Sequence, residues 1–353
     1  MKSRILEDDI CLVKLPPSSA CNLRLLERDT CVQIMPSKQD LESNHIQTVS
    51  RLASGTSGQV WLAENKELKE LRALKVLRHD EYFDTTAIKA WGRKFRAKRE
   101  QSNFVLGLIE SFHTGKEIIL VTEYMPGGDL ESYICRHGKL NMETARFYAA
   151  ELCHALRFIH QHEFIHRNLG LEHVLLTASG HIRLTGFGTC KDGMVHESRT
   201  TTFCGGLSTA PEILLDIPYG RAVDWWGFGI VLFQMLEAAS PFQGEDVDAI
   251  FDEILDDSKP VYPLEMPDSS RSILQQLLLR DPDMRLGANK DGVEGVTGHA
   301  FFAGTIWEDI AHERVPPPIS QQRPNAQEPT QESPVTDFPP AVDWSRLNIF
   351  SDF

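Results

Sequence analysis

Two glycines and a lysine near the start of the chain have types and spacing that suit the binding of a phosphate group. Gly55 and Gly58 lie in LASGTSGQV, and Lys75 follows in RALKV, flanked by apolar residues. Glycine lets backbone amides approach a phosphate closely because no Cβ intrudes. A lysine in mid-strand either carries its ammonium group to the surface or serves a buried anion. Each feature alone also fits a plain hairpin and a surface lysine.

Short β-branched and apolar runs surround these residues and predict a sheet. They place Lys75 in mid-strand and the two glycines between two strands. Between the runs, residues 84–100 have the composition of one amphipathic helix. The expected strands are residues 45–53, 58–64, 71–77, 105–112 and 117–124.

Helical patterns dominate after Gly128. Residues 222–238 are apolar nearly all round, which predicts a buried central helix, and residues 269–279 predict another helix. Residues 141–162 carry apolar side chains at spacings of three and four, which predicts a helix with one buried face. That face consists of Ala145, Tyr148, Leu152, Ala155 and Ile159.

A series of motifs follows in one order along the chain: TEYMPGGDL, IHRNLGLEHVLL, IRLTGFG, TAPEI, AVDWWGFGIVLF and DPDMRLG. Across about residues 46–302 the chain resembles a Ser/Thr protein kinase of the AGC group. The stretches FGTCKDGM, RTTTFCGG and HERVPPP are most similar to protein kinase N and next to protein kinase C.

The resemblance implies an α+β, two-lobed protein-kinase-like fold with a small β-rich lobe and a large helical lobe. It also implies an AGC-type C-terminal tail, in which Phe350 and Phe353 resemble the hydrophobic motif of the group. The expected division is a flexible leader over 1–44, a kinase-like domain over 45–302 with lobes at 45–124 and 125–302, and the tail over 303–353.

The resemblance assigns a nucleotide site between the lobes. Thr122 would stand at the gate of the hinge, and the backbone of Glu123 and Met125 would face an adenine edge. Ala53 stands where the glycine loop of the family has its first glycine. The expected nucleotide-binding residues are Gly55, Gly58, Val60, Ala73, Lys75, Glu123, Met125 and Leu175.

Four positions that carry chemistry in the family are replaced. Asn168 stands at the proton-accepting aspartate, and its amide cannot act as a base. Gly170 replaces the lysine that would meet the transferred phosphate. His173 replaces the metal-binding asparagine with an imidazole, which Mg²⁺ does not favour, and Gly186 replaces the metal-binding aspartate with no ligand atom. ATP is therefore the cofactor that the site could hold, and Mg²⁺ is not expected.

The predicted helix over 84–100 adds a fifth replacement. The glutamate that should pair with Lys75 falls near Arg93, and the sequence has no Asp or Glu between Asp84 and Glu100. Arg93 and the neighbouring Lys94 would repel Lys75, which favours a helix that swings outward.

The residues that hold the architecture of the family remain. Asp224 would anchor the catalytic loop through backbone hydrogen bonds, next to the retained Arg167. Glu212 and Arg285 would form a buried ion pair in the large lobe, which is costly to break by removing one partner. Also retained are Phe187, Ala210, Pro211 and Trp226.

Thr202 matches the activation-loop phosphosite of the family. A phosphate there could bridge Arg167 and Lys191, although an unmodified loop threonine fits the sequence equally well. Ser333, followed by Pro334, could be a second phosphosite, but chance explains that match equally well in so Pro-rich a tail.

The overall charge limits the class of partner. The chain has 36 basic and 50 acidic residues and a net charge of −14, which argues against a broad nucleic-acid footprint. Its apolar runs are too short to cross a membrane, and it begins with no signal peptide. Seven cysteines without a secretory signal predict free thiols and a cytoplasmic location. The expected partners are proteins of kinase signalling.

The residues that hold the architecture are retained, and the residues that carry the chemistry are replaced. Together these observations predict a pseudokinase, which acts as a scaffold or an allosteric partner and could bind ATP weakly. One alternative is a residually active, ATP-dependent Ser/Thr kinase, which would need Glu172 or a water in place of the base. A second is a nucleotide-sensitive switch that binds ATP through Lys75 without Mg²⁺.

Overall fold

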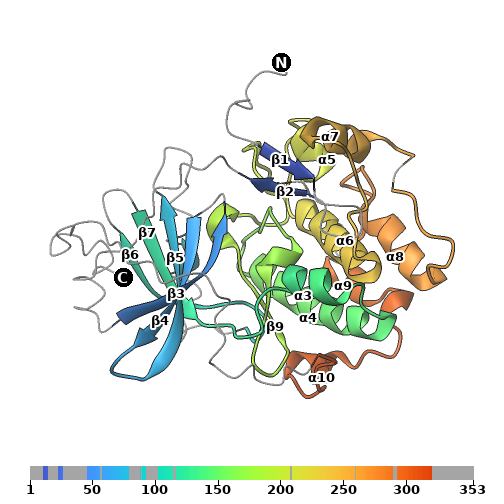
Figure 1. Ribbon diagram of the computed structural model, residues 1–353. Coiled ribbons are helices and arrows are strands. Elements are labelled where there is room, and N and C mark those ends of the chain that lie inside the picture. The colour runs from blue at the N-terminus through green and yellow to red at the C-terminus, as the bar shows by residue number, and fades with distance from the viewer. Residues whose placement is uncertain are drawn as a thin grey trace.

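The protein has two lobes, as expected from the resemblance, with a sheet in the small lobe and helices in the large one (Figure 1). The structure is a computed structural model. It describes residues 11–14, 23–26, 46–55, 58–78, 88, 90–92, 102–113, 117–206, 209–258, 260–288 and 292–319.

An antiparallel sheet of five strands, in the order β3-β4-β5-β7-β6, forms the small lobe. All five strands agree with the predicted runs within a few residues at their ends. Their bounds are β3 Ile46–Gly55, β4 Gly58–Asn65, β5 Glu70–Arg78, β6 Leu108–His113 and β7 Glu117–Glu123.

The two faces of this sheet differ in burial, as the alternation of side chains along a strand requires. On β5, Leu74 and Val76 are buried in a core that they share with Trp61 of β4. Ala73 and Lys75 alternate with them and are only partly buried. The sheet therefore presents Lys75 on the face opposite its own core.

The large lobe is built on two long helices. Its α4 (Met142–Gln161) and α6 (Ala222–Glu237) match the predicted helices, and the five apolar positions predicted for the face of α4 are all buried. Every residue from 223 to 233 on α6 is buried, which confirms a central helix. Around them lie α3 Leu130–His137, α5 Pro211–Leu214, α7 Val247–Leu255, α8 Asp268–Leu277, α9 Val293–Thr297, α10 Trp307–Ala311 and the strand pair β8 Val174–Leu176 and β9 Ile182–Leu184.

Short polar side chains begin several of these helices. Asp129 accepts a hydrogen bond from the Ser132 amide at the start of α3 (2.6 Å), and Asn141 accepts one from the Thr144 amide at the start of α4 (2.9 Å). Such caps satisfy amides that have no partner inside the helix. They fix where each helix begins, and the Asp129 cap follows the hinge directly.

Two expectations need correction. The leader contains a strand pair, β1 (Cys11–Lys14) with β2 (Leu23–Leu26), which its mixed composition did not predict. Most of the helix predicted over 84–100, including Arg93 and Lys94, lies outside the described residues. Trp91 within it is helical and stacks on Phe187 of the large lobe, with ring centroids 5.0 Å apart. Both rings are buried, so the helix at Trp91 packs inward rather than swinging outward.

The cysteine prediction is also only partly right. Cys153, Cys190 and Cys204 are free thiols, whereas Cys135 is disulfide-bonded.

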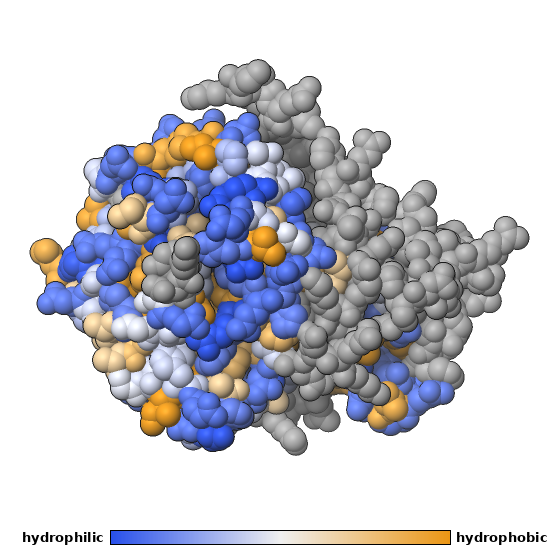
Figure 2. All heavy atoms as spheres, turned by 180° about the vertical axis from the view of Figure 1, so that it is seen from behind, coloured by the Kyte–Doolittle hydropathy of each residue, from blue (hydrophilic) through white to orange (hydrophobic). Residues whose placement is uncertain are grey.

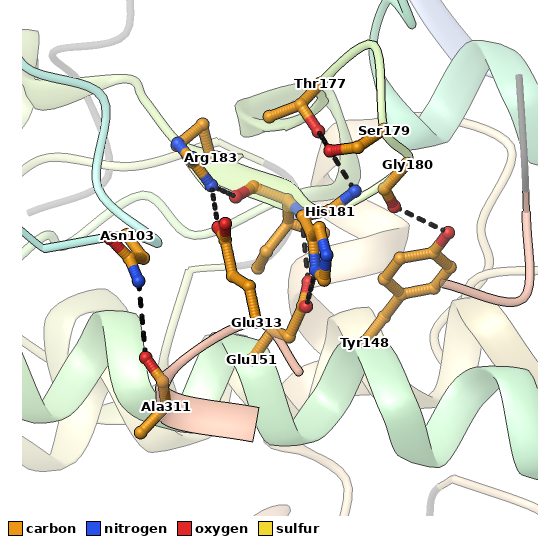
Figure 3. A network of polar contacts seen from close by, with 11 residues as sticks. Asn103, Tyr148, Glu151, Thr177, Ser179, Gly180, His181, Arg183, Ala311 and Glu313 are labelled. Atoms are coloured by element: carbon orange, nitrogen blue, oxygen red, sulfur yellow. Dashed lines mark hydrogen bonds and ion pairs between the residues drawn. The ribbon is translucent and has the colours of Figure 1, made fainter. Parts of the chain in front are cut away.

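A polar network ties the first part of the tail to both lobes (Figure 3). Asn103 donates to the Ala311 carbonyl (3.3 Å), and Arg183 of β9 forms an ion pair with Glu313 (2.8 Å). Beneath them lies the buried pair of Glu151 and His181, whose Oε1 and Nδ1 atoms are 2.5 Å apart. The sequence did not predict this anchoring or the helix α10. The tail motifs at Ser333, Phe350 and Phe353 lie outside the described residues.

The surface seen from behind is mainly hydrophilic over the described part of the large lobe, with apolar residues in small separate patches (Figure 2). No helix among the described residues is long and apolar enough to cross a membrane.

Candidate functional site

Lys75 of β5 lies on the face of the sheet opposite the core that contains Leu74 and Val76. Its neighbours in register are Val60 on β4 and Leu120 on β7. Burial lowers the pKa values of Lys75, His166 and His173, and the charge of Lys75 lowers those of the two histidines further. Among the described residues, no carboxylate forms an ion pair with Lys75. An anion at this point would therefore supply a counter-charge that the described residues do not.

The predicted adenine-facing residues come from three elements around Lys75. Ala73 is in register with the buried Thr122 of β7, whose hydroxyl donates to the Glu123 carbonyl (3.3 Å). Met125 is buried just beyond the strand, and Leu175 of β8 forms a bridge with Asp129. The arrangement suits a flat apolar ligand between the lobes, which remains a prediction for these residues.

The packing of the sheet by itself requires a glycine at position 58. Gly55 and Gly58 face each other where β3 turns into β4. Gly58 has φ 131°, and a Cβ there would overlap the carbonyl oxygen of Val76 on the adjacent strand. Glycine is thus required at 58 by the approach of β5, independently of any phosphate.

Asp224 holds the catalytic loop in place, as predicted. It is fully buried on α6 and accepts hydrogen bonds from the backbone amides of His166 (2.9 Å) and Arg167 (2.8 Å). The Nε2 atom of His160 lies 2.7 Å from Oδ2 of Asp224, the oxygen that also accepts from the His166 amide. Burial alone would raise the pKa of Asp224, but these hydrogen bonds and the nearby histidines lower it overall.

Arg167 is already engaged by neutral acceptors. Its guanidinium donates to the carbonyls of Thr189 (2.6 Å) and Cys190 (3.3 Å) and to the hydroxyl of Tyr219 (3.2 Å). Tyr219 in turn donates to the carbonyl of Thr202 (2.5 Å). The side chain of Thr202 is exposed, so its role as a phosphosite stays a prediction. Tyr219, which the motif analysis missed, links the activation segment to Arg167 without any phosphate.

Three of the replaced positions, Asn168, His173 and Gly186, lie together. Asn168 donates through Nδ2 to Nε2 of His173 (3.3 Å), and a Cβ on Gly186 would come within 2.6 Å of the His173 ring. Gly186 has φ 90°, a conformation that other residues rarely adopt. The imidazole thus occupies the space into which a side chain at 186 would extend.

The His173 ring carries no charge at neutral pH. Burial, with the charges of His166 and Lys75, holds its pKa well below the usual range. A neutral ring can accept at Nε2, which is the role that the bond from Asn168 requires. Among the described residues no group of three His, Cys, Asp or Glu side chains could hold a metal ion. His173 supplies a nitrogen and Gly186 supplies no ligand atom, whereas Mg²⁺ prefers oxygen ligands, so these two positions do not fit this ion.

Glu172, which the sequence offers as a stand-in for the missing base, lies beside the replaced positions of the loop. Its carboxylate folds over Gly170, where any larger side chain would overlap it, and lies 3.8 Å from Nε2 of His173. Burial first, and then the charges of Glu131 and Asp129, raise the pKa of Glu172 to about 7. The side chain is still 48% exposed, so solvent can reach the carboxylate.

The predicted ion pair of the large lobe is present. Arg285 donates to both carboxylate oxygens of Glu212, at 2.7 and 2.9 Å, and both side chains are almost completely buried. The guanidinium also lies over the ring of Trp226, 5.2 Å from its centroid. This pair fixes α5 and the end of the activation segment to the core.

Comparison with known proteins agrees with this geometry. The family model of the protein kinase domain matches residues 46–302. Protein kinase C of Aspergillus fumigatus is 44% identical over 281 residues, which is 78% of this chain and 25% of that protein. Protein kinase C-like 2 of Schizosaccharomyces pombe is 43% identical over 76% of this chain and 27% of its own length. The RAC serine/threonine-protein kinase of Drosophila melanogaster is 35% identical over 77% of this chain and 44% of its own.

The chain thus spans about a quarter of the length of the protein kinase C relatives that it matches. These relatives support an AGC-like kinase. The first two are named protein kinase C and protein kinase C-like 2, whereas the resemblance to protein kinase N stays a prediction. With its two lobes, its anchored catalytic loop and a match over residues 46–302, the chain belongs to the protein kinase domain family.

Proposed function

We propose that this chain is a pseudokinase, a protein of the kinase fold that binds nucleotide without Mg²⁺ and acts on signalling proteins in the cytoplasm by binding rather than by phosphoryl transfer. The observation that carries the proposal is the position of His173, whose ring fills the space beside Gly186. In the family that space belongs to the metal-binding aspartate.

The loss of the base supports the same reading. Asn168 is an amide, and its Nδ2 donor is used on His173 (3.3 Å). General-base help contributes typically about 10²–10⁴-fold to a rate, which is about 3–5 kcal/mol of barrier. Phosphoryl transfer depends chiefly on positioning and on charge neutralisation by the metal. In the described loop, Asn168 supplies no carboxylate at the base position and His173 supplies no oxygen ligand at the metal position, which supports the proposal.

Nucleotide binding is supported by Lys75. Its ammonium lies largely desolvated with no carboxylate partner among the described residues, and a phosphate would pair with it. In an ordinary kinase, acidic partners compete for this charge. Here the phosphate itself would be the counter-ion, so the affinity for ATP should not depend on Mg²⁺.

A thermal-shift titration with ATP, with and without Mg²⁺, tests the proposal. The expected result is a stabilisation that is indifferent to Mg²⁺ and is lost in Lys75→Met. Lys66→Met, at an exposed position in the β4–β5 turn, serves as the matched control and should keep the shift. A shift that appears only with Mg²⁺ would contradict the proposal, and no shift under either condition would remove nucleotide as a ligand.

A second candidate is a residually active, ATP-dependent Ser/Thr kinase. The comparisons favour it, because the relatives are named as protein kinases and are up to 45% identical. Glu172 also favours it, because a carboxylate with a pKa of about 7 beside the catalytic loop is a possible stand-in base. An assay of phosphate transfer to a basic peptide mixture decides between them. Activity that falls in both Lys75→Met and Glu172→Gln would establish the second candidate.

A further inference from the structure

A cavity of about 320 Å³ opens in the large lobe and shares no lining residue with the predicted nucleotide site. Its walls come from the end of α4, the activation segment, the start of α6 and the loop that leads into α9. In Figure 1, α4, α6 and α9 lie within the same lobe, away from the sheet. The volume is within the range of small-molecule sites, about 300–1,000 Å³.

Three arginines from three separate segments line this cavity. Arg157 comes from α4, Arg199 from the activation segment, and Arg221 from the residue just before α6. The chain as a whole has a net charge of −14, so a cluster of three arginines is a local region of positive charge on an acidic protein. Arginine presents a planar fork of donors that matches the oxygens of a phosphoryl group.

Each guanidinium has donors to spare. Arg199 donates through Nη1 to the Ser198 carbonyl (3.0 Å), and Arg221 donates through Nε to the Met194 carbonyl (3.0 Å), which leaves the other nitrogens of both without a described partner. The Nε atom of Arg157 is buried and has no hydrogen-bond acceptor among the described residues. Because this Nε atom is shielded from the cavity, an anion there would be met by Nη1 of Arg157 and by Nη2, which now lies 3.2 Å from Glu294.

Gly220 leaves room for the guanidinium of Arg199 at the wall of the cavity. A Cβ at this position would come within 3.0 Å of Nη1 of Arg199 and within 2.9 Å of the Ser198 carbonyl. Any larger residue would therefore push the guanidinium from the wall of the cavity. The first turn of α6 follows directly, and the positive end of its dipole adds to the same potential.

Two acidic residues complete the lining. Asp283 is exposed, and Glu294, which is 66% exposed, lies 3.2 Å from Nη2 of Arg157. Carboxylates at the rim repel a second anionic group but accept hydrogen bonds from hydroxyls. The lining thus combines a place for one phosphoryl group with a place for neutral hydroxyls.

We propose that this cavity binds a small phosphomonoester with free hydroxyls. Arg157, Arg199 and Arg221 hold the phosphoryl oxygens, while Asp283 and Glu294 accept from the hydroxyls. The site is independent of the nucleotide site. It is also coupled to the activation segment, because Tyr219 lines the cavity and contacts the Thr202 carbonyl (2.5 Å).

Isothermal titration of the full chain with ribose 5-phosphate, ribose and inorganic phosphate at constant ionic strength tests the proposal. We expect ribose 5-phosphate to bind, ribose not to bind, and inorganic phosphate to bind more weakly. In Arg199→Gln and in Arg157→Gln the affinity should fall about tenfold or more, because each removes a charge-assisted pair. Arg199 is exposed, so its variant should fold as the parent does.

Two controls separate this site from others. Arg136→Gln, on the exposed end of α3, where the side chain donates to the Ser132 carbonyl (3.0 Å), should leave the affinity unchanged. Lys75→Met should also leave it unchanged, since a loss there would place the ligand in the nucleotide site. The proposal is overturned if ribose 5-phosphate does not bind, if both arginine variants bind it like the parent, or if inorganic phosphate binds as tightly.

Discussion

The Nδ2 atom of Asn168 lies 3.3 Å from the Nε2 atom of His173, so the residue at the base position and the residue at a metal position are hydrogen-bonded to each other. This contact uses polar groups that the family directs at substrate and metal. The two side chains thus satisfy part of their hydrogen-bonding capacity with each other, whereas the buried Nδ1 atom of His166 in the same loop has no hydrogen-bond partner among the described residues.

Restoring only one metal ligand should destabilise the protein. Gly186→Asp would place a Cβ 2.6 Å from the His173 ring and a side chain on a residue with φ 90°. We expect a loss of about 1–3 kcal/mol in the free energy of unfolding. The double variant with His173→Asn removes the ring and should recover most of that loss, as urea denaturation of the four proteins of the cycle would show. Additive effects of the two substitutions would contradict the contact.

Restoring the base alone should not restore catalysis. Asn168→Asp supplies a carboxylate but leaves no metal ligand at 173 or 186, so ATP consumption should stay at the level of the parent. The triple variant Asn168→Asp, His173→Asn, Gly186→Asp should gain consumption that depends on Mg²⁺. A coupled assay of ADP release measures both, with Lys75→Met in the triple background as the inactive control. Substantial activity in the single variant would count against a metal-free site.

Glu172 should give the protein a small stability gain in acid that fades towards neutral pH. Its pKa is raised from an ordinary 4.5 to about 7, so between these values the folded state holds more protons than the unfolded state. The gain is complete below 4.5 and is lost as the pH rises through 7. Because the side chain is 48% exposed, we expect only about 1 kcal/mol. Melting temperatures of the parent and of Glu172→Gln, measured from pH 5 to 8, check this. The parent should lose stability relative to the variant as the pH rises, and a constant difference between the two would refute the raised pKa.

Breaking the buried ion pair should be severe. Arg285→Ala leaves the Glu212 carboxylate buried without its partner, for which we expect a loss of about 3–5 kcal/mol. Lys139→Ala breaks an ion pair in which the lysine is 55% exposed and should cost well under about 1 kcal/mol. Denaturant titrations compare the two. Similar losses for both variants would show that Glu212 is not held as the structure indicates.

Tyr219→Phe should loosen the activation segment without disturbing the core. It removes the bond to the Thr202 carbonyl (2.5 Å) and the one from Arg167 (3.2 Å), while keeping the ring. We expect about 1–2 kcal/mol less protection of residues 200–206 in hydrogen exchange. Residues of α6 should exchange as they do in the parent. If residues 200–206 were also protected as in the parent, the bridging role of Tyr219 would be contradicted.

The sequence predicted the positions that depend on local pattern or on a family motif. The strand around Lys75 and the buried face of α4 follow from periodicity, which is a short-range rule, whereas the pair Glu212–Arg285 spans 73 residues and follows from the resemblance to the family. The hairpin of β1 and β2 was missed, since its strands are only four residues long and have no clear alternation.

The arrangement inside the loop could not be predicted in the same way. The sequence shows that Asn168, His173 and Gly186 are replaced, but not that the ring of one fills the space of another, because that depends on side-chain direction and on the left-handed backbone at 186. The inward position of Trp91 was missed for a related reason. Charge repulsion near Lys75 suggested an outward helix, whereas the stacking of two large buried rings outweighs it.

The anchoring of the tail by Asn103 and Arg183 has a consequence for where the folding unit ends. The family match stops at residue 302, yet Ile310 and Ile319 belong to the main core and Trp307 packs on Phe302. A protein shortened at that limit would lose these apolar contacts and leave the ring of Phe302 uncovered. Any truncation intended to isolate the kinase fold should therefore retain the chain at least to Ile319.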